Sequence, residues 1–111
     1  MKNAPTDYRS LLDALARCAA ACNYCADACL SENDIQIMVP CIRLDRDCAD
    51  ICLVTATFIA RNSPHTPHIM KECIELCQKC HDECAKHSHD HCKQCAKACQ
   101  ECLVACKAYV A

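Results

Sequence analysis

The sequence predicts an all-α protein, an antiparallel up-down-up-down four-helix bundle with a cysteine-lined core, formed by residues 1–111 as a single domain. The chain has no glycine, which disfavours tight turns and hairpins and favours long helices. Cysteine supplies 16 of the 111 residues and recurs at steps of three and four, which is the helical period. Larger apolar residues are few, so we expect cysteine to fill the interior.

Proline and polar clusters divide the chain into four helical segments. The first is expected over about residues 6–31, where Thr6 or Asp7 can cap the start. The second is expected over about residues 34–61 and ends before a polar stretch that contains a proline. Pro40 lies inside this second segment. Because proline lacks an amide donor, we expect it to kink the helix or to delay its regular start.

The third and fourth segments are separated by a very short break. The third is expected over about residues 67–87, with Thr66 as the cap and Pro67 at the first helical position. The fourth is expected over about residues 89–109, after the break at residues 88–90. Short connections of this kind place consecutive helices side by side and antiparallel, as in an up-and-down bundle.

The cysteines form one stripe on each predicted helix. At about 100° per residue, each set stays within an arc of roughly 60 to 80° and faces the bundle core. The stripes are Cys18, Cys22, Cys25 and Cys29; Cys41, Cys48 and Cys52; Cys73, Cys77, Cys80 and Cys84; and Cys92, Cys95, Cys99, Cys102 and Cys106. Cysteine as a mere small core residue explains one or two such positions, but not four matching stripes.

The predicted interior differs between its two ends. One end is expected to be plugged by apolar side chains, namely Leu11, Leu15, Phe58, Ile59, Ile69, Met70 and Tyr109. The opposite end, which we call the mouth, gathers thiol, thioether and imidazole groups, namely Cys29, Met38, Cys41, His87, His89 and His91. We expect a lined interior that is closed at one end and open at the other.

The spacing of the thiols favours bound metal over disulfides. Helical neighbours four residues apart have Cβ atoms about 5 to 6 Å apart, whereas a disulfide needs about 3.5 to 4.5 Å. A linear sulfur-metal-sulfur bridge spans roughly 4.5 Å with bonds near the zinc value. Such a bridge fits a pair such as Cys18 and Cys22 after small rotamer changes.

Softness and charge favour Cu(I) among the thiophilic metals. Thiolate-rich sites suit Cu(I), zinc and iron-sulfur clusters. Divalent zinc on four thiolates leaves excess negative charge, which is costly to bury along a continuous tube. One Cu(I) per thiolate gives a neutral interior, so we expect many ions, on the order of one per cysteine. Iron-sulfur binding is disfavoured because the CxxC pairs lie within helices and no cysteine precedes proline.

Composition excludes several classes of partner. The net charge is −2 without a dense basic block, which argues against nucleic acid. No apolar run approaches 18 residues, and the N-terminus has no signal-peptide core, so we expect no membrane span and a cytoplasmic location. Thiols are kept reduced in that compartment, where dense cysteine indicates a metal binder more often than a disulfide framework.

Three stretches resemble a known family. They are Cys41-Ile-Arg-Leu-Asp-Arg-Asp-Cys-Ala-Asp-Ile-Cys52, Cys80-His-Asp-Glu-Cys84 and His87-Ser-His-Asp-His-Cys-Lys-Gln-Cys-Ala-Lys-Ala-Cys99. In spacing and in intervening residues the chain is similar to the bacterial cysteine-rich copper storage proteins, most closely to cytosolic members without an export signal. The likeness covers nearly the whole span from Cys18 to Cys106.

The resemblance implies a four-helix bundle that stores many Cu(I) ions, mostly through CxxxC pairs, and that associates as a homotetramer. It implies that His87 and His91 help ions to enter.

Met38 is a further candidate ligand at the mouth, with core filling as the alternative. Asp45 occupies the stripe position between Cys41 and Cys48, and either binds metal near the mouth or pairs with a neighbouring arginine.

We weigh storage against two other functions. A thiol redox sensor needs one or two exposed cysteines of low pKa at a helix N-terminus, and this pattern is not seen. A structural zinc-binding bundle needs fewer cysteines. No nucleophile, base and acid are placed together for catalysis, so we expect no enzyme activity. Besides copper ions, the expected partners are copper chaperones or chelators.

Overall fold

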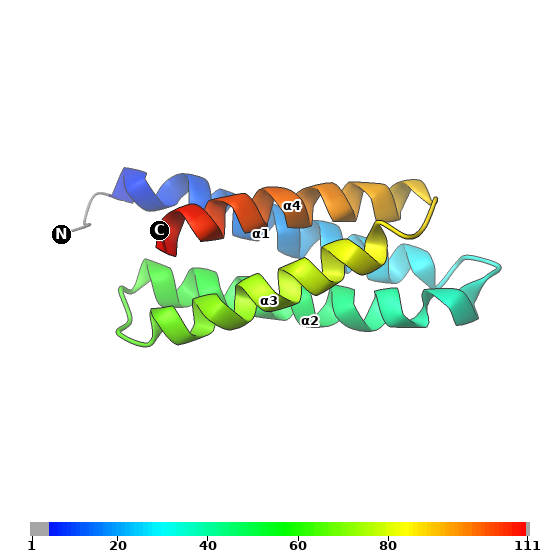
Figure 1. The fold of residues 1–111 in the computed structure, drawn as a ribbon, viewed down its shortest axis with the longest axis horizontal. Coiled ribbons are helices and arrows are strands. Elements are labelled where there is room, and N and C mark those ends of the chain that lie inside the picture. The colour runs from blue at the N-terminus through cyan, green and yellow to red at the C-terminus, as the bar shows by residue number, and fades with distance from the viewer. Residues whose placement is uncertain (1–4, 111) are drawn as a thin grey trace.

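The structure is a computed structural model that describes the backbone of residues 5–110 and the side chains of residues 8–110. Four helices make up nearly all of this part of the chain, and none of it forms a β-strand. They are α1 (Pro5–Cys29), α2 (Ile35–Ala60), α3 (Thr66–Cys84) and α4 (Asp90–Val110). The molecule is a rod with extents of 50 × 20 × 19 Å (Figure 1).

Consecutive helices run antiparallel and pack side by side (Figure 1). Helix α1 packs against α2 and α4, and α3 packs against the same two helices. The predicted up-down-up-down bundle is therefore confirmed. The α2–α3 connection lies at the same end as the start of α1 and the end of α4, and the other two connections lie at the opposite end.

The start of α3 differs from the sequence-based expectation. His65 occupies the N-cap position, and Thr66 is already helical. The Thr66 hydroxyl donates to the backbone carbonyls of Ser63, at 2.7 Å, and Phe58, at 3.4 Å, and no side chain caps the start of α3. The predicted Thr66 cap is therefore wrong, because the hydroxyl ties the preceding turn together instead. The proposed cap at Thr6 or Asp7 concerns side chains outside the described residues.

The end of α3 also differs from the expected boundary. The helix ends at Cys84, three residues before His87. The amide of His87 donates to the carbonyl of Cys84 in a single tight turn, so His87 lies in the connection to α4. In α2, regular helix begins at Ile35 and continues through Pro40, so proline does not delay the start.

The end of the bundle opposite the mouth is closed by apolar side chains. Leu11, Leu15, Ile59 and Met70 are at most 4% exposed and belong to the core cluster. Three further residues expected there are half-buried, namely Phe58, Ile69 and Tyr109. This apolar group, here called the plug, is contributed by all four helices.

Candidate metal centre

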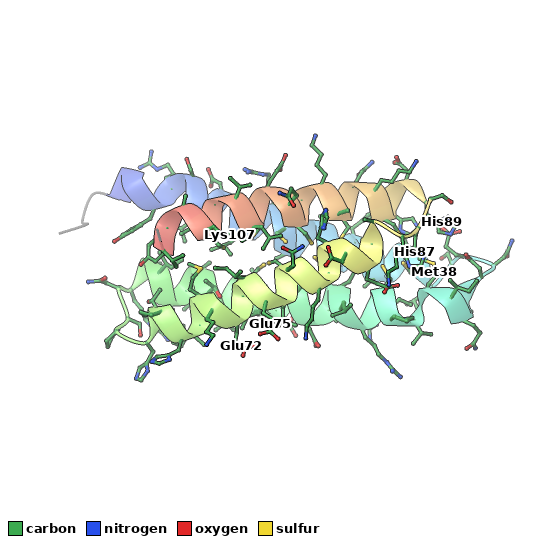
Figure 2. All side chains as sticks on the ribbon, viewed as in Figure 1. Met38, Glu72, Glu75, His87, His89 and Lys107 are labelled. Atoms are coloured by element: carbon green, nitrogen blue, oxygen red, sulfur yellow. The ribbon has the colours of Figure 1, made fainter. Side chains whose placement is uncertain are left out.

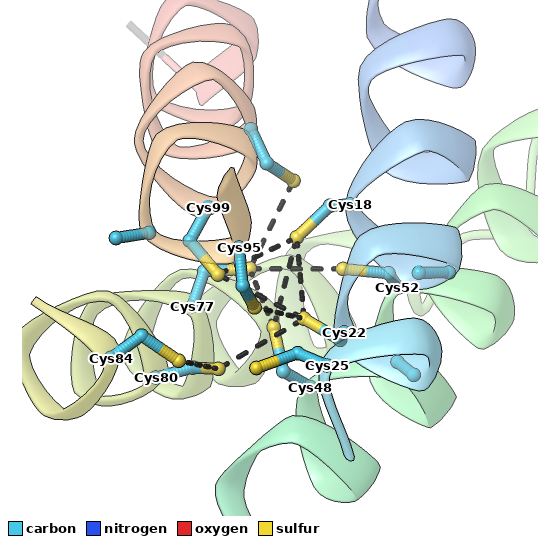
Figure 3. Packing of buried hydrophobic residues seen from close by; sticks show 14 of the residues in the cluster. Cys18, Cys22, Cys25, Cys48, Cys52, Cys77, Cys80, Cys84, Cys95 and Cys99 are labelled. Carbon is cyan, nitrogen blue, oxygen red and sulfur yellow. Dashed lines mark hydrogen bonds between the residues drawn. The ribbon is translucent and has the colours of Figure 1, made fainter. Parts of the chain in front are cut away.

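Every cysteine of the chain is fully buried. All 16 side chains are 0% exposed, and all are free thiols. They project from all four helices toward the bundle axis, as Figure 3 shows for ten of them. The predicted stripes therefore face the interior, and sulfur takes the place that leucine and isoleucine hold in ordinary bundles.

Thiols four residues apart on one helix lie too far apart for a disulfide. The Sγ atoms are 4.0 Å apart in Cys18/Cys22 and 3.9 Å apart in Cys25/Cys29. A disulfide requires about 2 Å. Three further pairs repeat this separation at 3.9 to 4.0 Å, namely Cys73/Cys77, Cys80/Cys84 and Cys102/Cys106. The separations are slightly shorter than the roughly 4.5 Å of a linear two-sulfur bridge, so small rotamer changes suffice.

Contacts between helices join these pairs into one column of sulfur. The Sγ atoms of Cys41 and Cys84 are 3.3 Å apart, which links α2 to α3. Cys95 of α4 lies 3.6 Å from Cys22 of α1 (Figure 3). Further links at 3.5 and 3.8 Å are Cys48/Cys77 and Cys18/Cys99. An ion anywhere along this axis has thiols from several helices within reach.

The column contains overlapping groups of four thiols. In each group all four sulfur atoms lie within 4.8 Å of one another. The groups include Cys18, Cys22, Cys48 and Cys99; Cys22, Cys80, Cys95 and Cys99; Cys18, Cys48, Cys52 and Cys77; Cys52, Cys73, Cys77 and Cys102; and Cys25, Cys29, Cys41 and Cys92. The first four groups share cysteines, and the last is joined to them through the Cys41/Cys84 and Cys80/Cys84 contacts at 3.3 and 4.0 Å. This is therefore a continuous ligand array and not a set of separate structural sites.

Asp45 is buried among the thiols. Its Oδ1 accepts from Cys80 at 3.1 Å and from Cys95 at 3.2 Å, and its Oδ2 accepts from Cys41 at 3.7 Å. Within residues 8–110 it forms no ion pair with an arginine, and its side chain faces inward. Metal binding by Asp45 stays a prediction. Burial, with neighbouring thiol groups next in importance, raises the pKa of Asp45 from 3.8 to about 9. The carboxyl group is therefore protonated at neutral pH.

His91 directs one ring nitrogen at the mouth thiols. Its Nδ1 lies 3.4 Å from Sγ of Cys25, 3.6 Å from that of Cys92 and 3.9 Å from that of Cys29. Its other ring nitrogen, Nε2, lies 2.7 Å from Oε2 of Glu32. The imidazole therefore stands between the thiol column and a carboxylate near the solvent.

The other expected mouth residues lie at the same end of the bundle, where the two remaining histidines contact carboxylates. Nε2 of His87 bonds to Glu83 at 2.9 Å, and within the described part of the chain His87 has no hydrogen bond to a thiol. His89 stacks on His91 with ring centroids 5.3 Å apart. Met38 is fully buried, and Figure 2 shows it at the same end as His87 and His89. The structure thus brings the predicted mouth together, and of its three histidines His91 alone has a hydrogen bond to a thiol within the described residues.

Two thiols near the mouth, those of Cys92 and Cys29, hold their protons at neutral pH. Burial is the main cause that raises the pKa of Cys92 from 9.0 to about 12, and the nearby Cys41 thiol adds to it. Burial also raises the pKa of Cys29. In the metal-free chain these sulfurs are neutral S–H groups. A metal that binds them must displace their protons, which makes binding pH-dependent.

Two residues of this region escaped the sequence analysis. Thr55 continues the cysteine stripe of α2, since it follows Cys52 by three residues, and it is fully buried. Among the described buried side chains, its hydroxyl alone lacks a hydrogen-bond partner. Glu32 lies in the connection between α1 and α2, where no helical period marks it. Stripe spacing alone identifies the position of Thr55, whereas no local pattern identifies Glu32.

The family model described as "Csp: Copper storage protein" matches residues 4–111. The chain belongs to the copper storage protein family. A curated relative, the uncharacterized cysteine-rich protein YhjQ of Bacillus subtilis (strain 168), is 42% identical over 81 residues, which are 73% of this chain and 75% of the relative.

Solved structures place this copper storage protein among metal-loaded relatives. The Cu(I)-bound copper storage protein BsCsp3 is 40% identical with a TM-score of 0.89, and the match covers 95% of this chain and 99% of that one. A cytosolic copper storage protein from Streptomyces lividans, solved with five coppers, is 39% identical with a TM-score of 0.87 and 95% coverage of both chains. These similarities confirm the four-helix fold and the expected family.

Proposed function

We propose that this copper storage protein stores multiple Cu(I) ions, on the order of one per cysteine, on thiolates that line its interior. The observation that carries the proposal is the continuous column of 16 buried, free thiols. Each Cu(I) that replaces a thiol proton leaves its site neutral, so the loaded column accumulates no buried charge. Soft thiolates suit Cu(I), and two structural relatives are described as copper-bound.

The proposed ligand set follows the column and its mouth. The sixteen cysteines supply the main ligands, and the overlapping four-thiol groups support this assignment. His91 is an entry ligand because its Nδ1 faces three thiols. Asp45 lies among the thiols and Met38 is buried at the same end, which supports both as further ligands. His87 is proposed to assist entry from the rim of the mouth.

The cellular setting is part of the proposal. We place the chain in the cytoplasm, because the Streptomyces lividans relative is described as cytosolic. None of the helices in the described residues combines the length and apolarity needed to cross a membrane. A storage role involves no catalysis. Copper chaperones or small chelators are the proposed donors and acceptors, with neither nucleic acid nor a membrane as partner.

Assembly as a homotetramer is also proposed. Its support on this chain is a set of exposed large apolar residues on the outer helix faces. They include Ile37 at 63%, Leu53 at 50%, Val54 at 41% and Val104 at 59% exposed. Light scattering of the purified chain is expected to give four times the monomer mass of 12.3 kDa. A mass of one chain would rule out the tetramer.

Anaerobic titration of the reduced protein with Cu(I), in competition with a chromophoric chelator, tests the storage function. The expected capacity is close to the 16 cysteines of the chain. Zinc is titrated in parallel, and we expect fewer zinc ions because divalent charge accumulates in the interior. A capacity of one or two copper ions would contradict storage and favour a structural site or a redox sensor.

Variants of the mouth histidines separate entry from capacity. Replacement of both His87 and His91 by alanine is expected to slow copper uptake and to leave the final capacity nearly unchanged. Alanine at His65 and His68, two exposed histidines beside the plug, provides the matched control. A large loss of capacity in the mouth variant would show that these histidines are storage ligands.

A further inference from the structure

The connection between α1 and α2 contacts residues at the start of α4. Glu32, which lies in this connection, contacts His91 through Oε2 and Nε2 at 2.7 Å. The same carboxylate oxygen lies 3.5 Å from Nδ1 of His89. Asp34 adds a second contact to His89 at 3.3 Å. Two carboxylates from this connection thus meet two stacked imidazoles, His89 from the α3–α4 connection and His91 from the first turn of α4.

The short contact fixes the proton on one nitrogen of the His91 ring. An ionised carboxylate accepts hydrogen bonds and donates none, so Nε2 of His91 must carry the hydrogen. In a neutral imidazole the other nitrogen then has a free lone pair. That nitrogen is Nδ1, which points at the thiols of Cys25, Cys29 and Cys92.

The ring is also held in orientation. The side chain of His91 is only 11% exposed, and the His89 ring lies nearly parallel to it, with an interplanar angle of 6°. Ligand histidines in metalloproteins commonly donate their second N–H to a carboxylate, which sets the tautomer and the ring orientation. The Glu32–His91 pair has this arrangement.

We propose that Glu32 is a positioning residue for copper entry: it holds His91 as the Nε2–H tautomer and so presents the Nδ1 lone pair to Cu(I) that arrives at Cys25, Cys29 and Cys92. The role rests on the proposed storage of Cu(I). Thiols that bind the ion release their protons to the solvent, and copper stays in the Cu(I) state throughout. Glu32 itself does not touch the metal.

The first test reads the tautomer without copper. Side-chain nitrogen chemical shifts of His91 are measured by NMR in the reduced, metal-free protein. Wild type is expected to show a protonated Nε2 and an unprotonated Nδ1. In Glu32→Lys an ammonium donor replaces the acceptor, so we expect the proton to move to Nδ1. Asp34→Lys makes the same charge change in the same connection and is expected to keep the wild-type tautomer.

The second test reads the rate of copper uptake in the same variants. Glu32→Lys is expected to load about 10- to 100-fold more slowly than Asp34→Lys, which is the usual cost of losing such a partner. Glu32→Gln is expected to load close to the wild-type rate, because its amide oxygen can accept the same hydrogen bond. Final capacity is expected to be unchanged in all three variants.

A double variant tests whether Glu32 acts through His91. Glu32→Lys combined with His91→Ala is expected to load no more slowly than His91→Ala alone. Slower loading of the double variant than of His91→Ala would overturn the proposal. An unchanged His91 tautomer in Glu32→Lys would also overturn it. So would a changed tautomer in Glu32→Lys with a normal rate of copper uptake. A low copper capacity in wild type would refute storage itself. The tautomer measurement needs no metal, so it still decides what Glu32 does to His91.

Discussion

The two ends of the bundle use the same four helices for opposite purposes. At the plug, Leu15 and Met70 fill the interior with apolar side chains and have no soft ligand among them except the thioether of Met70. At the mouth, Cys41 and Cys84 place their sulfurs 3.3 Å apart, and His91 faces further thiols. The helical period continues through both regions, so the identity of the stripe residues alone decides where metal can bind.

The comparison also shows how the fold tolerates a metal-binding interior. The plug supplies conventional hydrophobic stabilisation to one end of a thin rod. The thiol column supplies less apolar area for each residue, and Asp45 introduces a buried carboxyl group into it. The metal-free chain therefore depends on the plug and on helix packing, and we expect loading to stabilise mainly the mouth half.

The largest expected effect is stabilisation by copper. Any ligand that binds only the folded chain raises its stability, and several tightly bound ions act together. We expect full loading with Cu(I) to raise the melting temperature by more than about 20 °C. Amide hydrogen exchange should slow more around Cys25 and Cys41 than around Leu11. Equal protection at both ends would contradict the difference that we draw between them.

The next effect comes from Asp45 in the metal-free protein. Its folded pKa, about 9, lies above the ordinary value of 3.8, so the unfolded chain releases this proton first as the pH rises. The stability contributed by the protonated carboxyl group is complete below pH 3.8 and is lost progressively toward pH 9. Between pH 4 and pH 7 the loss is about 4 kcal/mol.

Asp45→Asn removes this titration and provides the comparison variant. Urea unfolding of both metal-free proteins from pH 4 to pH 9 is the measurement. The variant is expected to lose less stability than wild type over this range, whereas Asp47→Asn, an exposed carboxylate on the same helix, should follow wild type. Parallel curves for Asp45→Asn and wild type would show that Asp45 is already ionised in the folded chain.

One substitution in the plug and one in the thiol column should separate effects on stability from effects on copper capacity. Leu15→Ala leaves a cavity in the plug and is expected to cost about 3 kcal/mol with no loss of copper capacity. Cys99→Ala removes only one sulfur atom, so it should cost less stability but lower the capacity. Urea unfolding and copper titration of both variants provide the data. Loss of capacity in Leu15→Ala would mean that the plug takes part in storage.

The smallest expected effect concerns Thr55, which stands between Cys52 and Ile59 on the α2 stripe. Its buried hydroxyl lacks a partner, and replacement by a shape-matched apolar side chain removes that cost. Thr55→Val is expected to stabilise the metal-free protein by about 1 kcal/mol. Thr57→Val, at an exposed position, serves as the control. A destabilised Thr55→Val would indicate that the hydroxyl makes a bond in solution.

The sequence was sufficient for the bundle and for its interior, because a three-and-four spacing of cysteine admits one inward face for each helix. It misplaced the end of α3, since His87 continues the Cys84 stripe by three residues although the chain leaves the helix at Cys84. Thr66 fits the pattern of a cap, but its hydroxyl donates to the preceding turn. Local sequence patterns do not decide where a helix ends or which residue caps it when tertiary contacts make that choice.

The contacts of the candidate site needed the three-dimensional structure. Asp45 had two alternatives in the sequence, and only the placement of α2 beside α3 and across the core from α4 shows four thiols around its carboxyl group. Glu32 is 59 residues from His91, so no spacing rule connects them. The ligand types were predictable from composition, whereas the group that orients His91 was not.

Copper is expected to occupy the thiol column and not the plug. Anomalous diffraction at the copper absorption edge, from crystals of fully loaded protein, tests it most directly. We expect a row of copper peaks along the axis from the level of Cys29 to that of Cys106, each beside at least two sulfurs, and none among Leu11, Leu15 and Ile59. Peaks confined to surface histidines, with an empty interior, would contradict it.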